Sequence, residues 1–151
     1  MIREQIKTRL IEALKAKNET VVSTLRLMNA AIKDKDIAAR PAGNTDGIDD
    51  VAILNLLQSM IKQRRESIDM YLKGGRDELA KAEQAEIDVI ASFLPKQMDD
   101  NEVDVAIREV ISSTGASSIK DMGKVMGVLK GTYSGKMDFA KASAKIKEFL
   151  S

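Results

Sequence analysis

Apolar residues recur along the chain at the spacing of three and four residues that is typical of amphipathic α-helices. In the first segment an isoleucine or leucine stands at every fourth position from Ile2 to Leu14, and Asn18 follows as a helix-capping residue. Glycine, proline and aspartate separate the later stripes from one another. The pattern predicts helices over residues 2–16, 18–38, 49–73, 77–93, 99–115, 118–130 and 138–150.

Four leucines show how far the apolar stripes are expected to extend. Leu14 ends the stripe of the first helix, and Leu72 and Leu79 lie on the stripes of the third and fourth helices. We expect these three side chains to point inward. Leu27 lies off the main stripe of its helix, so the helix over residues 18–38 is expected to be buried on more than one side.

The composition favours an all-α fold. Of the 151 residues, 44% are apolar, 31% are charged and only 3% are aromatic, and proline occurs twice. Because the residue before a proline avoids the helical conformation, the chain is expected to divide at Leu94-Pro95. We predict an N-terminal subdomain of long helices, residues 1–95, and a C-terminal three-helix subdomain, residues 96–151. Residues 40–47 form the clearest loop and are given no chemical role.

Cysteine and histidine are both absent. Their absence excludes disulfides, thiolate nucleophiles, imidazole bases and the usual zinc sites. Glycine-rich loops of the Walker and Rossmann types are also absent. The sequence therefore assigns no catalytic residue, no cofactor and no metal. The N-terminal segment lacks a signal-peptide core and no apolar run approaches about 18 residues. We expect a soluble, cytoplasmic protein without a membrane partner.

Arg64 falls on the apolar side of its predicted helix, and so do Glu83 and Glu86 on the following one. When the two helices are reflected about the turn at Gly74-Gly75, position 64 comes level with position 85. We therefore predict that Arg64 pairs with Glu86, Glu83 or both in a half-buried ion pair that sets the helix register. Two acids on one helix indicate no particular metal.

The most unusual stretch of the chain runs from Thr114 to Gly127. Ser118 is a good N-cap, and an acid follows three residues later. Gly123 and Gly127 then stand inside the helix, where each costs roughly 1 kcal/mol relative to alanine. They fall beside the apolar stripe, among lysines. Such a surface suits the close approach of a phosphate backbone or of another polypeptide. The alternatives are a tight packing contact at the border of the stripe and the end of a short, frayed helix.

Charge is distributed unevenly, although the net charge is only +1. Residues 1–40 and 117–151 each carry +4, whereas residues 99–109 carry −4. A basic terminal segment is compatible with an anionic partner. The candidate phosphate ligands are Lys120, Lys124, Lys130, Lys136, Lys141 and Lys145. A second basic group, Lys62, Arg64 and Arg65, is better explained by local pairing of Lys62 with Glu66 and of Arg65 with Asp69.

Several segments together resemble the YqeY family, which is related to the tail of the GatB subunit of tRNA-dependent amidotransferases. They are Leu25-Arg-Leu27, residues 62–67, Gly75-Arg-Asp77 with Glu83 and Glu86, Phe93-Leu-Pro95, and residues 114–127. The resemblance covers nearly the whole chain. It implies a small bacterial, all-helical protein with two subdomains, and a tail module that contacts tRNA outside the catalytic centre. The large catalytic body of GatB is absent, so the family's amidotransferase-like label does not imply activity.

These observations support three hypotheses. The first is a stand-alone tRNA-binding accessory module that recognises RNA shape and backbone, alongside an aminoacyl-tRNA synthetase or an amidotransferase. The second is a protein-interaction module in which the strip at Gly123 and Gly127 receives a partner helix. The third is a component of a carbon–nitrogen ligase that uses glutamine as amido-nitrogen donor. Salt dependence separates the first two, because phosphate contacts weaken steeply as salt rises.

Overall fold

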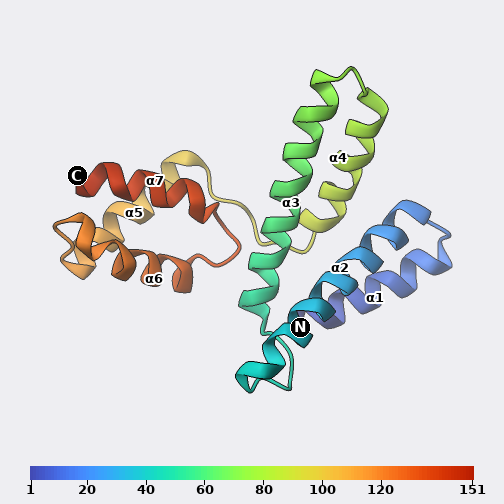
Figure 1. The fold of residues 1–151 in the computed structure, drawn as a ribbon, viewed down its shortest axis with the longest axis horizontal. Coiled ribbons are helices and arrows are strands. Elements are labelled where there is room, and N and C mark those ends of the chain that lie inside the picture. Colours follow the sequence, from blue (N-terminus) through green and yellow to red (C-terminus); the bar gives the residue numbers. More distant parts are fainter. The chain divides into compact units, whose positions relative to one another are not determined.

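The computed structural model describes residues 1–151, and it is built of α-helices with two short 3₁₀ turns and no strand (Figure 1). The prediction of an all-α fold is confirmed. None of the helices combines the length and the apolar character needed to cross a bilayer. The elements in chain order are α1 (Ile2–Lys15), α2 (Glu19–Ala39), η1 (Arg40–Ala42), α3 (Asp50–Lys73), α4 (Asp77–Ala91), α5 (Asp100–Thr114), η2 (Ile119–Asp121), α6 (Met122–Thr132) and α7 (Phe139–Leu150).

Short polar side chains fix the starts of four helices. The side-chain oxygens of Asn18, Asp49, Asp99 and Asp138 accept hydrogen bonds from backbone N–H groups in the first turns of α2, α3, α5 and α7. These N–H groups have no partner within their own helix, so each cap stabilises the helix that follows it. The predicted starts of these helices are confirmed.

The chain forms two compact units, Met1–Leu94 and Pro95–Ser151, and each has its own buried apolar cluster. The boundary between them coincides with the predicted division at Leu94-Pro95; that the two parts are separate subdomains, residues 1–95 and 96–151, stays a prediction. In the first unit, α1 packs against α2, and α3 packs against α4 along a hairpin that turns at Gly74-Gly75 (Figure 1). Helix α4 also packs on α2. The fully buried side chains of this unit are Ile6, Thr24, Leu25, Met28, Ile53, Leu57 and Ile90.

The four leucines that were expected to be buried are exposed. Leu14, Leu27, Leu72 and Leu79 have exposed fractions between 42% and 54%. Helix α2 is therefore not buried on the side of Leu27, and that expectation is wrong. Leu72 and Leu79 flank the Gly74-Gly75 turn at the free end of the α3–α4 hairpin (Figure 1). An apolar stripe predicts which face of a helix points inward, but it does not predict where the helix that packs on this face ends.

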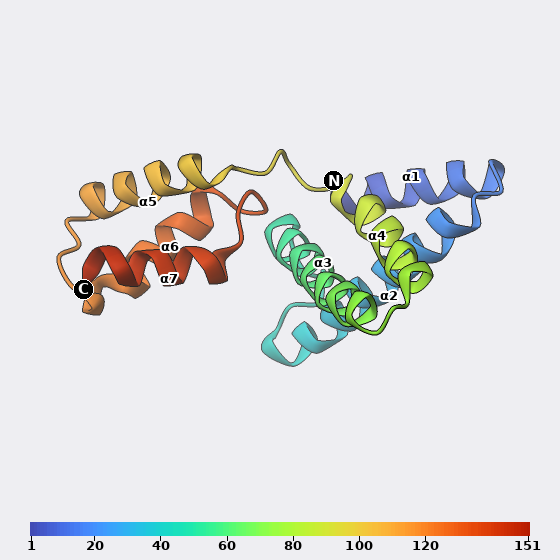
Figure 2. The ribbon, with the colours of Figure 1, turned by 90° about the horizontal axis from the view of Figure 1, so that it is seen from above.

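The second unit is a three-helix bundle in which each of α5, α6 and α7 contacts the other two (Figure 2). Its fully buried side chains are Ile107, Val125, Leu129, Ala142 and Ile146. Helix α6 is preceded by the 3₁₀ turn η2, whose Asp121 carboxylate accepts hydrogen bonds from the N–H groups of Ser117 and Ser118. Ile119 stands three residues before Met122 and six before Val125, at the spacing of an apolar stripe, yet it is exposed, because a 3₁₀ turn does not keep the α-helical spacing.

Candidate nucleic-acid interface

Three glycines follow one another at successive turns of α6 and are exposed. We call Gly123, Gly127 and Gly131 the glycine strip. A Cβ atom placed at any of the three would meet no atom within 4 Å, and none has a positive φ. Neither packing within this chain nor backbone conformation therefore requires glycine there. Helix α6 continues to Thr132, beyond the end predicted at residue 130, so Gly131 lies within the helix; its four-residue spacing from Gly127 was the signal for this.

The lysines of α6 fall into two groups. Lys120, in the turn before α6, and Lys130 are exposed and make no ion pair. Lys124 instead donates from Nζ to the carbonyl oxygen of Thr114, at 3.3 Å. That carbonyl belongs to the last residue of α5, where the backbone lacks helical partners. Lys124 therefore has a structural role at the end of α5, in addition to its position beside the strip.

Lys145 on α7 does not belong to the free cations. Its Nζ lies 2.9 Å from Asp104 Oδ1 on α5, and both side chains are about one-third exposed. The hydrogen bond to Asp104 raises the pKa of Lys145 above its usual value, against the opposing effect of burial. That Lys145 contacts phosphate stays a prediction, and its ammonium group is already paired with Asp104 in this structure. Sequence spacing could not reveal a partner on a different helix.

The two remaining candidate lysines are exposed. Lys141 lies in the first turn of α7, and its backbone N–H is capped by Asp138. Lys136 lies in the turn before α7, and its carbonyl oxygen accepts a hydrogen bond from the N–H of Met98. Neither side chain forms an ion pair. The cations without a protein partner in the second unit therefore include Lys120, Lys130, Lys136 and Lys141.

Arg64 lies between α3 and α4. Its Nε donates to Glu86 Oε2 at 2.8 Å, and its Nη1 donates to the carbonyl oxygen of Met60 at 3.2 Å. The exposed fractions of the Arg64 and Glu86 side chains are 14% and 26%, so the pair is largely buried. No hydrogen bond joins Arg64 to Glu83. A charge-assisted contact at this depth fixes how the two helices are aligned.

The local pairs expected on the exposed side of α3 do not form. Lys62 and Arg65 are exposed, and neither has an acidic side chain within ion-pair distance. Long side chains on a solvated helix face lose conformational entropy when they pair, and the gain in water is small. These two cations therefore remain free on the first unit.

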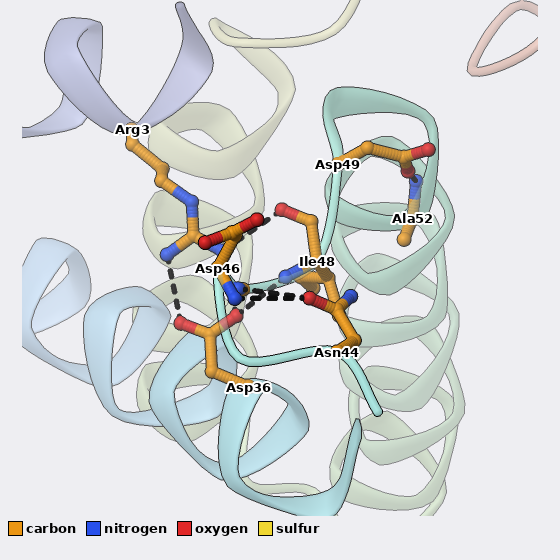
Figure 3. A network of polar contacts seen from close by, with 8 residues as sticks. Arg3, Asp36, Asn44, Asp46, Ile48, Asp49 and Ala52 are labelled. Atoms are coloured by element: carbon orange, nitrogen blue, oxygen red, sulfur yellow. Dashed lines mark hydrogen bonds and ion pairs between the residues drawn. The ribbon is translucent and has the colours of Figure 1, made fainter. Parts of the chain in front are cut away.

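A network that the sequence did not reveal holds the loop between α2 and α3 (Figure 3). The Arg3 guanidinium donates to both oxygens of Asp36, at 2.8 and 2.6 Å, and to the carbonyl oxygen of Ile48 at 2.9 Å. The N–H of Ile48 donates to Asp36 at 2.8 Å. The hydrogen bond from Arg3 lowers the pKa of Asp36 to about 2. Every carboxylate oxygen is directed at a donor, so this is a structural clamp.

Gly47 lies against this clamp and shows how closely the loop approaches it. Its φ is +97°, and an added Cβ atom would lie 2.8 Å from Arg3 Nη2 and 3.0 Å from Asp36 Oδ1. Glycine is therefore required at this position both for its backbone conformation and for space. No group of acidic side chains in the structure has an arrangement that could hold a metal ion.

Comparison with known proteins adds a family and several relatives. Residues 3–150 match a family model described as "Yqey-like protein". The chain is similar to "Altered inheritance of mitochondria protein 41, mitochondrial" of Eremothecium gossypii, with 37% identity over 59% of this chain and 46% of the relative. The protein of the same name from Saccharomyces cerevisiae (strain ATCC 204508 / S288c) is 31% identical over 66% of this chain and 52% of the relative. The chain thus spans about half the length of these two relatives.

A third relative aligns along nearly the whole chain. The protein of that name from Pyrenophora tritici-repentis is 26% identical over 99% of this chain and 81% of its own length. All three relatives are mitochondrial proteins by name. This finding contradicts the expectation of a bacterial, cytoplasmic protein. The expectation came from the family resemblance and from the character of the N-terminal segment, and neither distinguishes bacteria from organelles.

Proposed function

Because this chain belongs to the YqeY family, whose model spans nearly all of it, we propose that it is an accessory module that binds tRNA through the glycine strip of α6 and the free lysines of the second unit. It has no catalytic activity of its own in this proposal. It would act alongside an aminoacyl-tRNA synthetase or a glutamine-dependent amidotransferase.

The observation that carries the proposal is the glycine strip, which makes no packing contact within the chain that would require glycine. Three glycines in a helix cost roughly 3 kcal/mol relative to three alanines. No contact within the chain offsets this cost, since each Cα faces open space. A helix surface without side chains lets another molecule approach the backbone closely. Lys124 and Lys130 flank the strip on the helical wheel, and their ammonium groups favour an anionic ligand.

The aromatic residues of this unit favour contacts to RNA backbone and shape over contacts to bases. Tyr133 and Phe139 pack against the buried cluster of the unit. The exposed Phe149 already lies under the Arg108 guanidinium, at 5.3 Å from the ring centre. No free aromatic ring stands beside the glycine strip to stack on a splayed base. Recognition through phosphates and the helical shape of RNA is the mode that remains.

The test is binding of bulk tRNA to the full-length protein across a salt series. The test variant carries Lys120→Gln, Lys130→Gln and Lys141→Gln. Lys124 and Lys145 are left in place because they hold Thr114 and Asp104. If each of the three lysines neutralises one phosphate, the slope of log affinity against log salt should flatten by about 2 to 3.

The matched control carries Lys33→Gln, Lys35→Gln and Lys81→Gln on exposed positions of the first unit. Both variants remove three positive charges, so the net charge falls from +1 to −2 in each. We expect the control to bind tRNA like the unaltered protein. Equal losses in the two variants, or no tRNA binding by the unaltered protein at low salt, would overturn the proposal and direct attention to a polypeptide at the strip.

A further inference from the structure

A second surface of the C-terminal unit combines an apolar floor with an acidic rim. It is an open hollow of about 350 Å³ along α5, on the helix that precedes the glycine strip. Val105, one of the residues that line it, is 55% exposed. The hollow is lined by Met98, Val105, Ala106 and Tyr133, by Asn101, and by Glu102 and Glu109, the two acids that we call its rim.

The two acids that line the hollow have no cation of the chain within ion-pair distance. Residues 99–109 carry −4. Asp104 is held by Lys145, and the one cation of the segment, Arg108, lies on the ring of Phe149. Glu102 and Glu109 form no ion pair. An occupant of the hollow should therefore present an apolar side chain between two cations that are about two helical turns apart.

Helix α1 presents such a surface to solvent. Ile11 and Leu14 are 47% and 49% exposed. Lys7 and Lys15 lie one turn before and one turn after Ile11, are exposed, and form no ion pair. The two lysines are eight residues apart, which is about 12 Å along a helix, and the two glutamates of the rim are seven residues apart, which is about 10 Å.

We propose that the acidic hollow on α5 docks α1 of a second copy of this chain, with the two helices antiparallel. Lys7 then faces Glu109, Lys15 faces Glu102, and Ile11 rests on Val105. The contact joins exposed surfaces of both copies and leaves the glycine strip uncovered. The proposal goes beyond the RNA function and does not depend on it.

The antiparallel direction follows from the charges at the ends of the contact. In this direction Glu4 faces Ser112, which carries no charge. The parallel direction would set Glu4 against Asp99 and place like charges together. Antiparallel helices also bring opposite ends of their dipoles together, which is favourable.

The test is the mass of the full-length protein against concentration, measured by sedimentation equilibrium at low salt without RNA. One variant carries Glu102→Lys and Glu109→Lys, and the other carries Lys7→Glu and Lys15→Glu. All four positions are exposed, so circular dichroism should show unchanged folding. In each variant alone, the proposed contact between α5 and α1 brings like charges together. We expect its dissociation constant to rise about tenfold or more relative to the unaltered protein.

The mixture of the two variants is the decisive measurement, because only the proposed contact restores opposite charges in it. The basic α5 of one meets the acidic α1 of the other, and the other pair of surfaces is unaltered, so the mixture should associate more tightly than either variant alone. A control with Glu66→Lys and Asp69→Lys, on exposed acids of α3, which belongs to neither surface, should associate like the unaltered protein. A protein that stays monomeric, variants that match this control, or a mixture that does not associate would each overturn the proposal.

Discussion

Replacing Gly123 and Gly127 by alanine should make the second unit more stable. Both residues lie inside α6 with room for a Cβ atom and without a positive φ. Alanine loses less backbone freedom on folding than glycine does. Each glycine-to-alanine change at an exposed helical position should therefore raise the free energy of unfolding by about 1 kcal/mol. Because neither added methyl group contacts another residue, the two effects should add to about 2 kcal/mol.

The assay is urea unfolding followed by tyrosine fluorescence. The chain has two tyrosines and no tryptophan, so a Tyr71→Phe background leaves Tyr133, which packs on the core of the second unit, as the only reporter. If the m-value lies near the lower end of the range for small proteins, a gain of about 2 kcal/mol in the free energy of unfolding should raise the urea midpoint by about 1–2 M.

Gly115→Ala is the matched control. Gly115 ends α5 with φ +68° and also has open space for a Cβ atom. The left-handed conformation costs an alanine roughly 1–2 kcal/mol, so this variant should be less stable although the substitution is the same. A midpoint that is unchanged or lower in the Gly123→Ala/Gly127→Ala variant would refute the reasoning. If RNA approaches the strip closely, the same variant should also bind tRNA more weakly while being more stable.

Three further predictions concern the ion pairs. The pKa of Asp36 is lowered to about 2. The ionised Asp36 carboxylate therefore stabilises the fold fully above about pH 4, and this stabilisation is lost as pH falls toward 2. In Asp36→Asn, the loss of thermal stability between about pH 4 and pH 2 should be smaller than in the unaltered protein. Glu86→Gln leaves the largely buried charge of Arg64 without its ionic partner and should lower the free energy of unfolding by about 1–3 kcal/mol in urea titrations; no measurable loss would contradict the structural role. Lys145→Met should cost about 1 kcal/mol or less, because its pair with Asp104 is partly exposed, and should leave the salt slope of tRNA binding unchanged; a flatter slope would show that Lys145 contacts phosphate after all.

The sequence alone determined which segments are helical, the capped starts of four helices, and two of the three glycines of the strip. Caps such as Asn18 and Asp99 act on amides two or three residues away, so the whole interaction lies within one turn of chain. The spacing of Gly123 and Gly127 is local in the same sense. Arg64 and Glu86 are 22 residues apart, but a tight turn at Gly74-Gly75 makes a helical hairpin nearly as predictable as a single helix.

Only the tertiary structure decided which charged and apolar side chains are free. Lys145 meets Asp104 across 41 residues, and Arg3 meets Asp36 across 33. No periodicity connects such residues, because their distance depends on how separate helices pack. The exposure of Leu72 has the same origin, since a helix can continue its apolar stripe beyond the end of its neighbour. Local patterns specify what each helix can offer, and packing then selects which of those groups remain available to another molecule.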